Sequence, residues 1–220
     1  SLICILRQSE YLNKLDSSTK STLQRNIIHL EEYSKPQLED ILEDRINLAF
    51  KQGTVSTQTM TLLAESAYSE GGNARYAIEL LWRAGKYADA SEMQEVSPEC
   101  VRKAAVSVYP VVRKDMIPFL RFHEKLFLLG VARYFKQTDN AYMSMGEAEE
   151  AYAVVCEEYG EKKRGHTQLW KYTKELSASG IIETKVSVGR QRGKTTLISL
   201  PRVPASDLEQ ALTKVLIQAN

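Results

Sequence analysis

The sequence predicts a mainly α-helical protein in which a small helical bundle precedes a helix-turn-helix domain with a β-hairpin. Three observations support this fold class. Apolar residues recur at helical spacing through most of residues 34–179. Two strand-like segments, residues 181–188 and 195–200, follow and are joined through the turn-forming sequence GRQRGK. Two short apolar runs at residues 2–6 and 26–30 are typical of strands in a parallel sheet.

The composition bounds the class of protein. Of the 220 residues, 43% are hydrophobic and 26% are charged, which is normal for a globular chain and argues against wholesale disorder. Cys4, Cys100 and Cys156 match no disulfide framework or zinc pattern, so we expect reduced thiols in a cytoplasmic protein. The apolar run at residues 2–6 is too short to span a bilayer, and no membrane partner is expected. Because the chain starts at Ser1 beside this run, we expect it to be part of something longer.

Charge is distributed unevenly along the chain. The net charge is only +1, but residues 162–194 hold nine basic and two acidic residues and carry +7, so the remainder carries −6. Such an asymmetry is the electrostatic footprint of a polyanion-binding site on an otherwise ordinary protein. The C-terminal part is therefore the expected nucleic-acid-binding part.

Four short helices are predicted for the first domain. Ser97 is a plausible N-cap followed by Pro98 at the first helical position, and Gly71-Gly72 end the second helix. Helices of this length with short connections form a small bundle. The expected helices cover about residues 34–52, 56–68, 73–88 and 97–108. The third helix is expected to bury Ala74, Ile78, Leu81, Ala84 and Ala88.

The second domain has the element order of a winged helix-turn-helix. Tyr109-Pro110 and Pro118 bracket the expected domain boundary. Helices at about residues 123–136, 144–159 and 166–179 precede the two strands, and a last amphipathic helix follows at about 206–218. The helix that begins near His166 is the expected recognition helix, with a core face formed by Leu169, Tyr172, Thr173 and Leu176.

Three stretches in this order resemble archaeal origin-recognition-type (Orc/Cdc family) AAA+ replication initiators. YSKPQLEDILEDR (residues 33–45) is similar to the segment that opens the family's lid domain, and GGNARYAIELLWRAGKYAD (residues 71–89) looks like its sensor-two helix. The winged helix with its GRQRGKTT wing (residues 189–196) resembles the C-terminal domain of the archaeal members. The resemblance implies the end of an AAA+ α/β core at residues 1–32, a helical lid at 33–112 and a winged-helix DNA-binding domain at 113–220.

The resemblance implies a fragment of a replication initiator. Family members bind ATP or ADP with magnesium between the AAA+ core and the lid, recognise duplex origin DNA, and help to load the replicative helicase. Other initiator subunits and that helicase are thus implied partners, and a cytoplasmic, nucleoid-associated location is expected. For this chain the resemblance implies nucleotide sensing by Arg75, directly after Gly71-Gly72 at a helix start, where a guanidinium can reach a bound triphosphate. Neither a catalytic residue nor a metal ligand is expected in this chain.

The expected DNA contacts lie in the basic segment. The first residues of a recognition helix meet base edges, so Gln168 is a candidate reader of adenine and Lys171 of guanine. Arg190 and Arg192, flanked by glycines at the hairpin tip, are expected to contact phosphates or enter a minor groove. Trp170 is expected to pack against the wing. The full expected set is Lys162, Lys163, Arg164, Thr167, Gln168, Lys171, Lys174, Arg190, Gln191, Arg192 and Lys194.

Two alternatives remain open from the sequence. One is a winged-helix transcription regulator whose helical bundle serves oligomerisation, and the other is a complete ATPase whose core has been excised. The GRQRGKTT stretch does not decide between them. Only three residues separate Gly189 from Gly193, and the stretch precedes a strand, whereas a phosphate loop has four and precedes a helix.

We predict that this chain alone has no ATPase activity, although the full-length parent is implied to be an AAA+ ATPase. Catalysis of phosphoryl transfer relies on a phosphate-binding loop, its lysine and a bound metal ion, and Arg75 alone cannot replace them. The check is the rate of magnesium-dependent ATP turnover by the purified 220-residue chain. A turnover above that of a matched blank would contradict the prediction.

Overall fold

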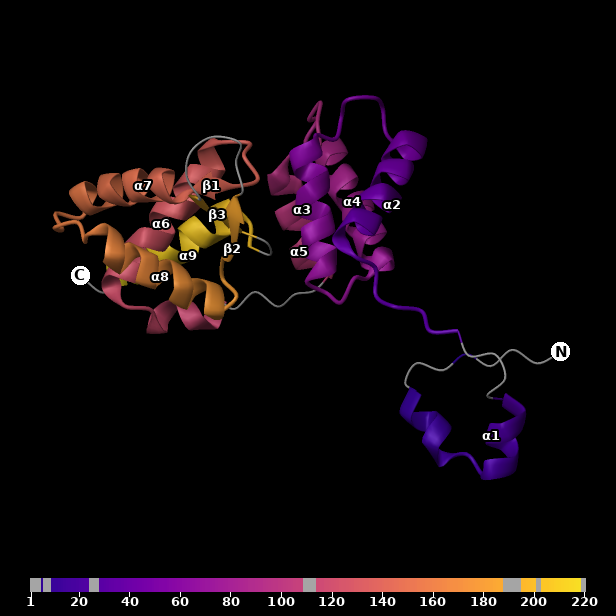
Figure 1. The fold of residues 1–220 in the computed structure, drawn as a ribbon. Coiled ribbons are helices and arrows are strands. Elements are labelled where there is room, and N and C mark those ends of the chain that lie inside the picture. Colours follow the sequence, from indigo (N-terminus) through magenta and orange to yellow (C-terminus); the bar gives the residue numbers. More distant parts are fainter. Residues whose placement is uncertain are drawn as a thin grey trace. The chain divides into compact units, whose positions relative to one another are not determined.

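The computed structural model describes Ile5 and residues 9–23, 28–108, 114–187, 195–200 and 203–218. These residues form two compact units, Ser1–Glu32 and Tyr33–Asn220, and each is described by itself (Figure 1). The fold is mainly helical, as predicted, with one small sheet. No helix among the described residues is long and apolar enough to cross a membrane.

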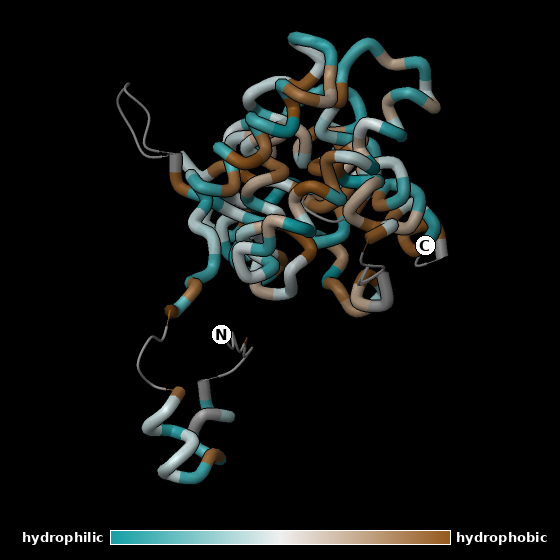
Figure 2. The backbone as a smooth tube through the Cα atoms, turned by 90° about the vertical axis from the view of Figure 1, so that its right-hand side faces the viewer, coloured by the Kyte–Doolittle hydropathy of each residue, from teal (hydrophilic) through white to brown (hydrophobic). Residues whose placement is uncertain are grey.

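The smaller unit holds a 3-10 helix η1 (Ser9–Lys14) and helix α1 (Ser17–Leu23). Asp16 caps α1, because its carboxylate accepts hydrogen bonds from the backbone N–H of Thr19 at 2.9 Å and from the Thr19 hydroxyl at 2.6 Å. The described trace of this unit is coloured mostly white and teal in Figure 2, with few hydrophobic residues. It therefore has little apolar surface with which to build a core of its own.

The strands expected in this unit are not found in its described residues. Ile5 and residues 28–30 have no regular structure, and the rest of the two runs lies outside the described residues. Ile5, Ile28 and Leu30 are each more than 80% exposed. A strand needs a neighbouring strand for its backbone N–H and C=O groups, and none of the described residues of this unit forms one.

Four helices form the first part of the larger unit, close to the expected positions. They are α2 (Lys35–Ala49), α3 (Thr57–Tyr68), α4 (Ala74–Ala90) and α5 (Pro98–Val108). Ser34 and Gln37 make a capping box at the start of α2, and the Asn73 side chain accepts a hydrogen bond from the Tyr76 N–H at the start of α4. Gly71 and Gly72 have φ angles of +74° and +62°, a left-handed conformation that explains why glycines end α3 here.

The buried face of α4 differs from the expected one. The structure buries Tyr76, Ala77 and Leu80 together with Leu81, Ala84 and Ala88, whereas Ile78 is 38% exposed. Helix α4 packs against α5. The buried residues recur at helical spacing on one face, and Ile78 lies at the edge of that face.

The winged-helix part contains η2 (Lys114–Phe119), α6 (Phe122–Gln137), β1 (Met143–Ser144), α7 (Met145–Glu158), α8 (His166–Ala178), β2 (Glu183–Ser187), β3 (Thr195–Ser199) and α9 (Ala205–Gln218). The sheet order is β1-β3-β2, and both pairings are antiparallel. The two-residue strand β1 was not expected, because it is too short to give an alternating pattern. Ser144 at its end also caps α7 and forms the expected capping box with Glu147. The expected boundary at Tyr109-Pro110 lies outside the described residues.

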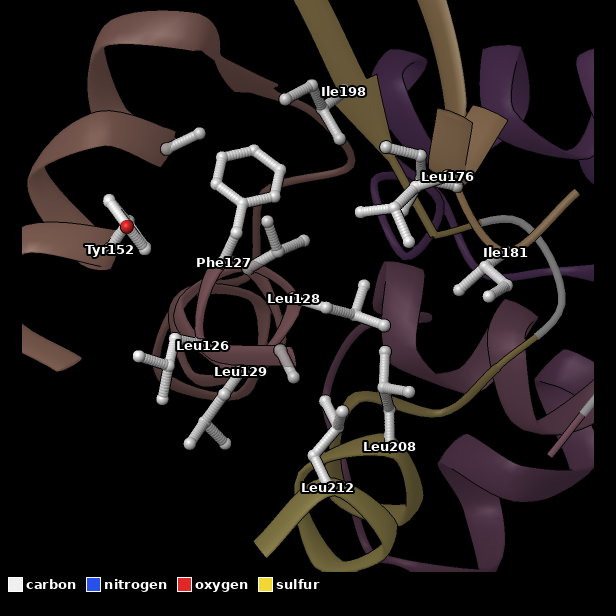
Figure 3. Packing of buried hydrophobic residues seen from close by; sticks show 14 of the residues in the cluster. Leu126, Phe127, Leu128, Leu129, Tyr152, Leu176, Ile181, Ile198, Leu208 and Leu212 are labelled. Atoms are coloured by element: carbon white, nitrogen blue, oxygen red, sulfur yellow. The ribbon is translucent and has the colours of Figure 1, made fainter. Parts of the chain in front are cut away.

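Helix α6 is the buried axis of this part. All residues from His123 to Ala132 are buried, so α6 has no solvent face over this length. In Figure 3 the side chains of α6 project in different directions, with Phe127 on the side of Tyr152 and Leu128 on the side of Leu208. At Gly130 an added Cβ would lie 2.9 Å from the backbone carbon of Ala151, so glycine permits the close crossing of α6 and α7.

A buried arginine joins the helical bundle to the winged helix. Arg102 of α5 is 1% exposed, and it donates to the Leu200 carbonyl at 3.1 Å and to the Asn140 carbonyl at 3.2 Å. Its third contact is the Glu99 carboxylate at 3.1 Å, and Glu99 also accepts from the Ala205 N–H at 3.0 Å. Burial raises the pKa of the Glu99 carboxyl despite the nearby Arg102, which acts to lower it.

We predict that Arg102→Ala destabilises the larger unit by about 3–5 kcal/mol, because it removes the charged partner of Glu99, the donor to the buried Leu200 carbonyl and the donor to the partly buried Asn140 carbonyl. The control is Arg83→Ala, which breaks the half-exposed pair with Glu79 and should cost about 0–1 kcal/mol. Urea unfolding of both variants measures the difference. Equal losses would show that Arg102 contributes no more than a surface ion pair.

Candidate nucleic-acid interface

Helix α8 presents two different faces. Leu169, Tyr172, Thr173 and Leu176 are buried, as expected for the core face of a recognition helix. The expected contact residues Thr167, Lys171 and Lys174 are exposed, and Gln168 is half-buried. Lys171 forms an exposed ion pair with Glu175 at 4.0 Å, and an exposed pair of this kind holds the two side chains together only weakly. The structure thus directs two lysines of α8 toward solvent.

The basic loop before α8 is held at its backbone. The Tyr152 hydroxyl accepts a hydrogen bond from the Arg164 N–H at 3.2 Å and lies 2.8 Å from Nδ1 of His123. The side chains of Lys162, Lys163 and Arg164 are exposed, and none is paired with a carboxylate among the described residues. Buried contacts to α6 and α7 therefore position the loop, while its three charges stay available.

The expected wing residues Arg190, Gln191, Arg192 and Lys194 lie outside the described residues. The strands on either side are described, and Ser187 pairs with Thr195 at the end of the β2–β3 ladder. The chain between these two residues connects paired antiparallel strands, as the sequence predicts for a hairpin.

Trp170 and Lys174 form a pair that the sequence analysis did not identify. The Lys174 ammonium lies 3.7 Å from the centre of the Trp170 ring, a cation–π contact. Trp170 is 42% exposed and faces β2 and β3, so it packs only partly against the wing strands. The sequence contains a sign of this pair, because residues four apart on a helix lie on the same face.

The ammonium group of Lys185 on β2 forms an ion pair with the helical bundle. Oε1 of Glu65 on α3 accepts from Lys185 at 2.9 Å and from Lys35 at 2.5 Å, and Oε2 accepts from the Tyr142 hydroxyl at 2.5 Å. Burial acts to raise the pKa of Glu65, but these hydrogen bonds outweigh it and hold the pKa below its usual value. The sequence gives no sign of this contact between residues 120 positions apart, so the +7 count overstates the free charge.

Arg75 lies where the sequence placed it, in the first turn of α4. Its side chain is exposed, and it has no ion pair or hydrogen bond within the described part of the chain. Among the described residues, no group of three or more His, Cys, Asp or Glu side chains is placed to hold a metal ion. Arg75 is therefore an available cation at a helix start.

Comparison with known proteins agrees with this architecture. Residues 39–106 match the Cdc6 AAA+ ATPase-type lid domain, and residues 115–211 match the CDC6 C-terminal winged helix domain. The chain is 35% identical over 211 residues to ORC1-type DNA replication protein 2 of Sulfolobus acidocaldarius, with 93% of this chain covered and 51% of that protein. The solved structure of Cdc6p from Pyrobaculum aerophilum superposes with a TM-score of 0.84 and 35% identity over 96% of this chain and 56% of that one.

A lid domain followed by a winged helix defines the class of protein. The chain belongs to the archaeal origin-recognition-type (Orc/Cdc6) family of AAA+ replication initiators, of which it carries the C-terminal portion. It spans about half the length of the curated relatives that it matches. The resemblance of the three sequence stretches to this family is thereby confirmed.

We predict that the stability of the larger unit falls as the pH drops below about 6.5, in part because of His123. Burial, with a smaller contribution from Arg164, lowers the pKa of His123, while Glu161 opposes the shift. The unfolded chain therefore takes up a proton near pH 6.5 that the folded chain binds only at lower pH, so stability is complete above 6.5 and is lost below it.

The measurement is urea unfolding at pH values from about 7.5 to 5.5 for the wild type and His123→Gln. The variant should lose less stability over this interval than the wild type. Exposed His29→Gln is the control and should follow the wild-type profile. Parallel profiles for the wild type and His123→Gln would refute the assignment.

Proposed function

We propose that this chain binds duplex DNA through helix α8, the basic loop before it and the wing. The observation that carries the proposal is the outward direction of Lys171 and Lys174 on α8, next to a basic loop whose side chains are not neutralised. A helix of this kind, presented by a helix-turn-helix core, fits the major groove. Membership of a replication initiator family makes origin DNA the proposed target.

The proposed contacts divide into two kinds. Lys162, Lys163 and Arg164 serve as phosphate contacts, which position the protein without reading sequence. Gln168 and Lys171, near the start of α8, are the proposed readers of base edges. Arg190, Gln191, Arg192 and Lys194 are proposed on sequence grounds as wing contacts to the backbone or the minor groove, and Thr167 and Lys174 complete the set.

We further propose that the lid senses nucleotide in the longer protein. Arg75 is exposed in the first turn of α4, and a guanidinium there can contact the γ-phosphate of ATP bound to the upstream core. ATP or ADP with magnesium would then be a ligand of the parent rather than of this chain alone. Contacts with other initiator subunits and with the replicative helicase are proposed on family membership alone.

The test is a salt titration of DNA affinity for Arg190→Ala/Arg192→Ala, with one origin duplex and one random duplex. Two lost phosphate contacts should weaken binding to both duplexes and reduce the salt slope of log affinity by about 2. Gln168→Ala or Lys171→Ala should instead cost about 1–3 kcal/mol on the preferred duplex and less on the random one. If the double variant keeps the wild-type affinity and slope on both duplexes, the wing is a solvated loop and the proposed DNA surface is wrong.

A further inference from the structure

A small hollow lies between helix α8 and the strands of the wing. Its volume is about 140 Å³. Pockets that hold whole ligands or cofactors usually measure roughly 300–1,000 Å³, so this hollow suits one chemical group of a larger molecule. The described residues that form it are chiefly Trp170 and Lys174 of α8, Thr184, Lys185 and Val186 of β2, and Thr196 of β3.

The walls of the hollow combine apolar surface with one ammonium group that has no carboxylate partner among the described residues. Trp170 is 42% exposed and Val186 is 59% exposed, and both line the hollow. Lys174 has only the Trp170 ring as a neighbouring partner among the described residues. Lys185 also lines the hollow, but its ammonium is hydrogen-bonded to Glu65 and lies 3.4 Å from the centre of the Tyr142 ring, so its charge is already paired.

This combination selects the chemistry of the occupant. The Lys174 ammonium favours an anionic group, and the exposed apolar walls favour a nonpolar group attached to it. A sugar–phosphate unit has both parts, with a charged phosphate and the carbon framework of a deoxyribose. The bases of a duplex are paired and stacked, so the backbone is the part of duplex DNA that can enter a hollow of this size.

We propose that this hollow seats one sugar–phosphate unit of a DNA strand that passes between α8 and the wing. The phosphate lies against Lys174, and the deoxyribose packs on Trp170 and Val186. The seat fixes the register of α8 in the groove rather than reading a base, since backbone contacts position a protein on DNA. The inference rests on the proposed DNA-binding function, which it extends by a specific contact.

The seat predicts different effects for its charged and apolar residues. Lys174→Gln removes one phosphate contact and should reduce the salt slope of log affinity by about 1 on any duplex. Trp170→Ala removes an uncharged contact, so it should weaken binding about fivefold at every salt concentration and leave the slope unchanged. Trp170→Phe keeps an apolar wall and should retain most of the affinity.

The matched control is Lys214→Gln on α9, an exposed lysine on a helix that does not line the hollow. It removes the same charge and should leave the slope unchanged. A direct readout comes from tryptophan emission, because the chain has only Trp82 and Trp170. In a Trp82→Phe background, addition of duplex DNA should change the emission of Trp170.

The outcomes separate the seat from the proposed function. If the wild type binds no duplex, the proposed function fails and the seat fails with it. If the wild type binds and the wing double variant has a reduced slope, the function stands. In that case equal slopes for Lys174→Gln and Lys214→Gln, or unchanged affinity for Trp170→Ala with unchanged Trp170 emission, overturn the seat alone. Thermal unfolding of each variant verifies that the fold is retained.

Discussion

The close crossing of α6 and α7 at Gly130 is the constraint on which the position of the basic loop and the start of α8 depends. Because a Cβ at Gly130 would collide with the backbone at Ala151 and Tyr152, only glycine lets α7 lie this near to α6. The crossing sets the position of Tyr152, whose hydroxyl holds the Arg164 N–H and contacts His123. The basic loop and the start of α8 thus take their place from a contact that is buried and apolar.

The sequence predicts most of the helices and their caps, for a physical reason. Helical periodicity, an N-cap residue and a following glycine are local signals, and α2, α3, α7 and α8 each carry at least two of them. The strands expected at residues 2–6 and 26–30 lack this support, since strand formation depends on partners elsewhere in the chain. On α4, Leu81, Ala84 and Ala88 are buried as expected, but Ile78 is 38% exposed, because apolar periodicity outlines a stripe without fixing where its edge lies.

The candidate site also combines features that local sequence patterns predict with contacts that they do not predict. The outward direction of Lys171 and Lys174 follows from the period of α8, so the sequence alone places it. The binding of Lys185 by Glu65 depends on how the bundle and the winged helix meet, and no local pattern records that contact. Counting charges along the sequence therefore gives an upper limit for the charge that a site can offer to a ligand.

The contacts between the bundle and the winged helix also limit how freely these two parts can be recombined. Glu65 of the bundle accepts hydrogen bonds from Lys35, Tyr142 and Lys185. At a second point, Arg102 donates to the Asn140 and Leu200 carbonyls, and Glu99 accepts from the Ala205 N–H. Residues of both parts are therefore in contact at two separate points. A chimera that joins the bundle of one relative to the winged helix of another inherits an unpaired buried charge unless both sets of partners are exchanged together. The strands β2 and β3 and the chain after them are for the same reason matched to residues of α3 and α5, so the two parts are exchanged successfully only as one piece.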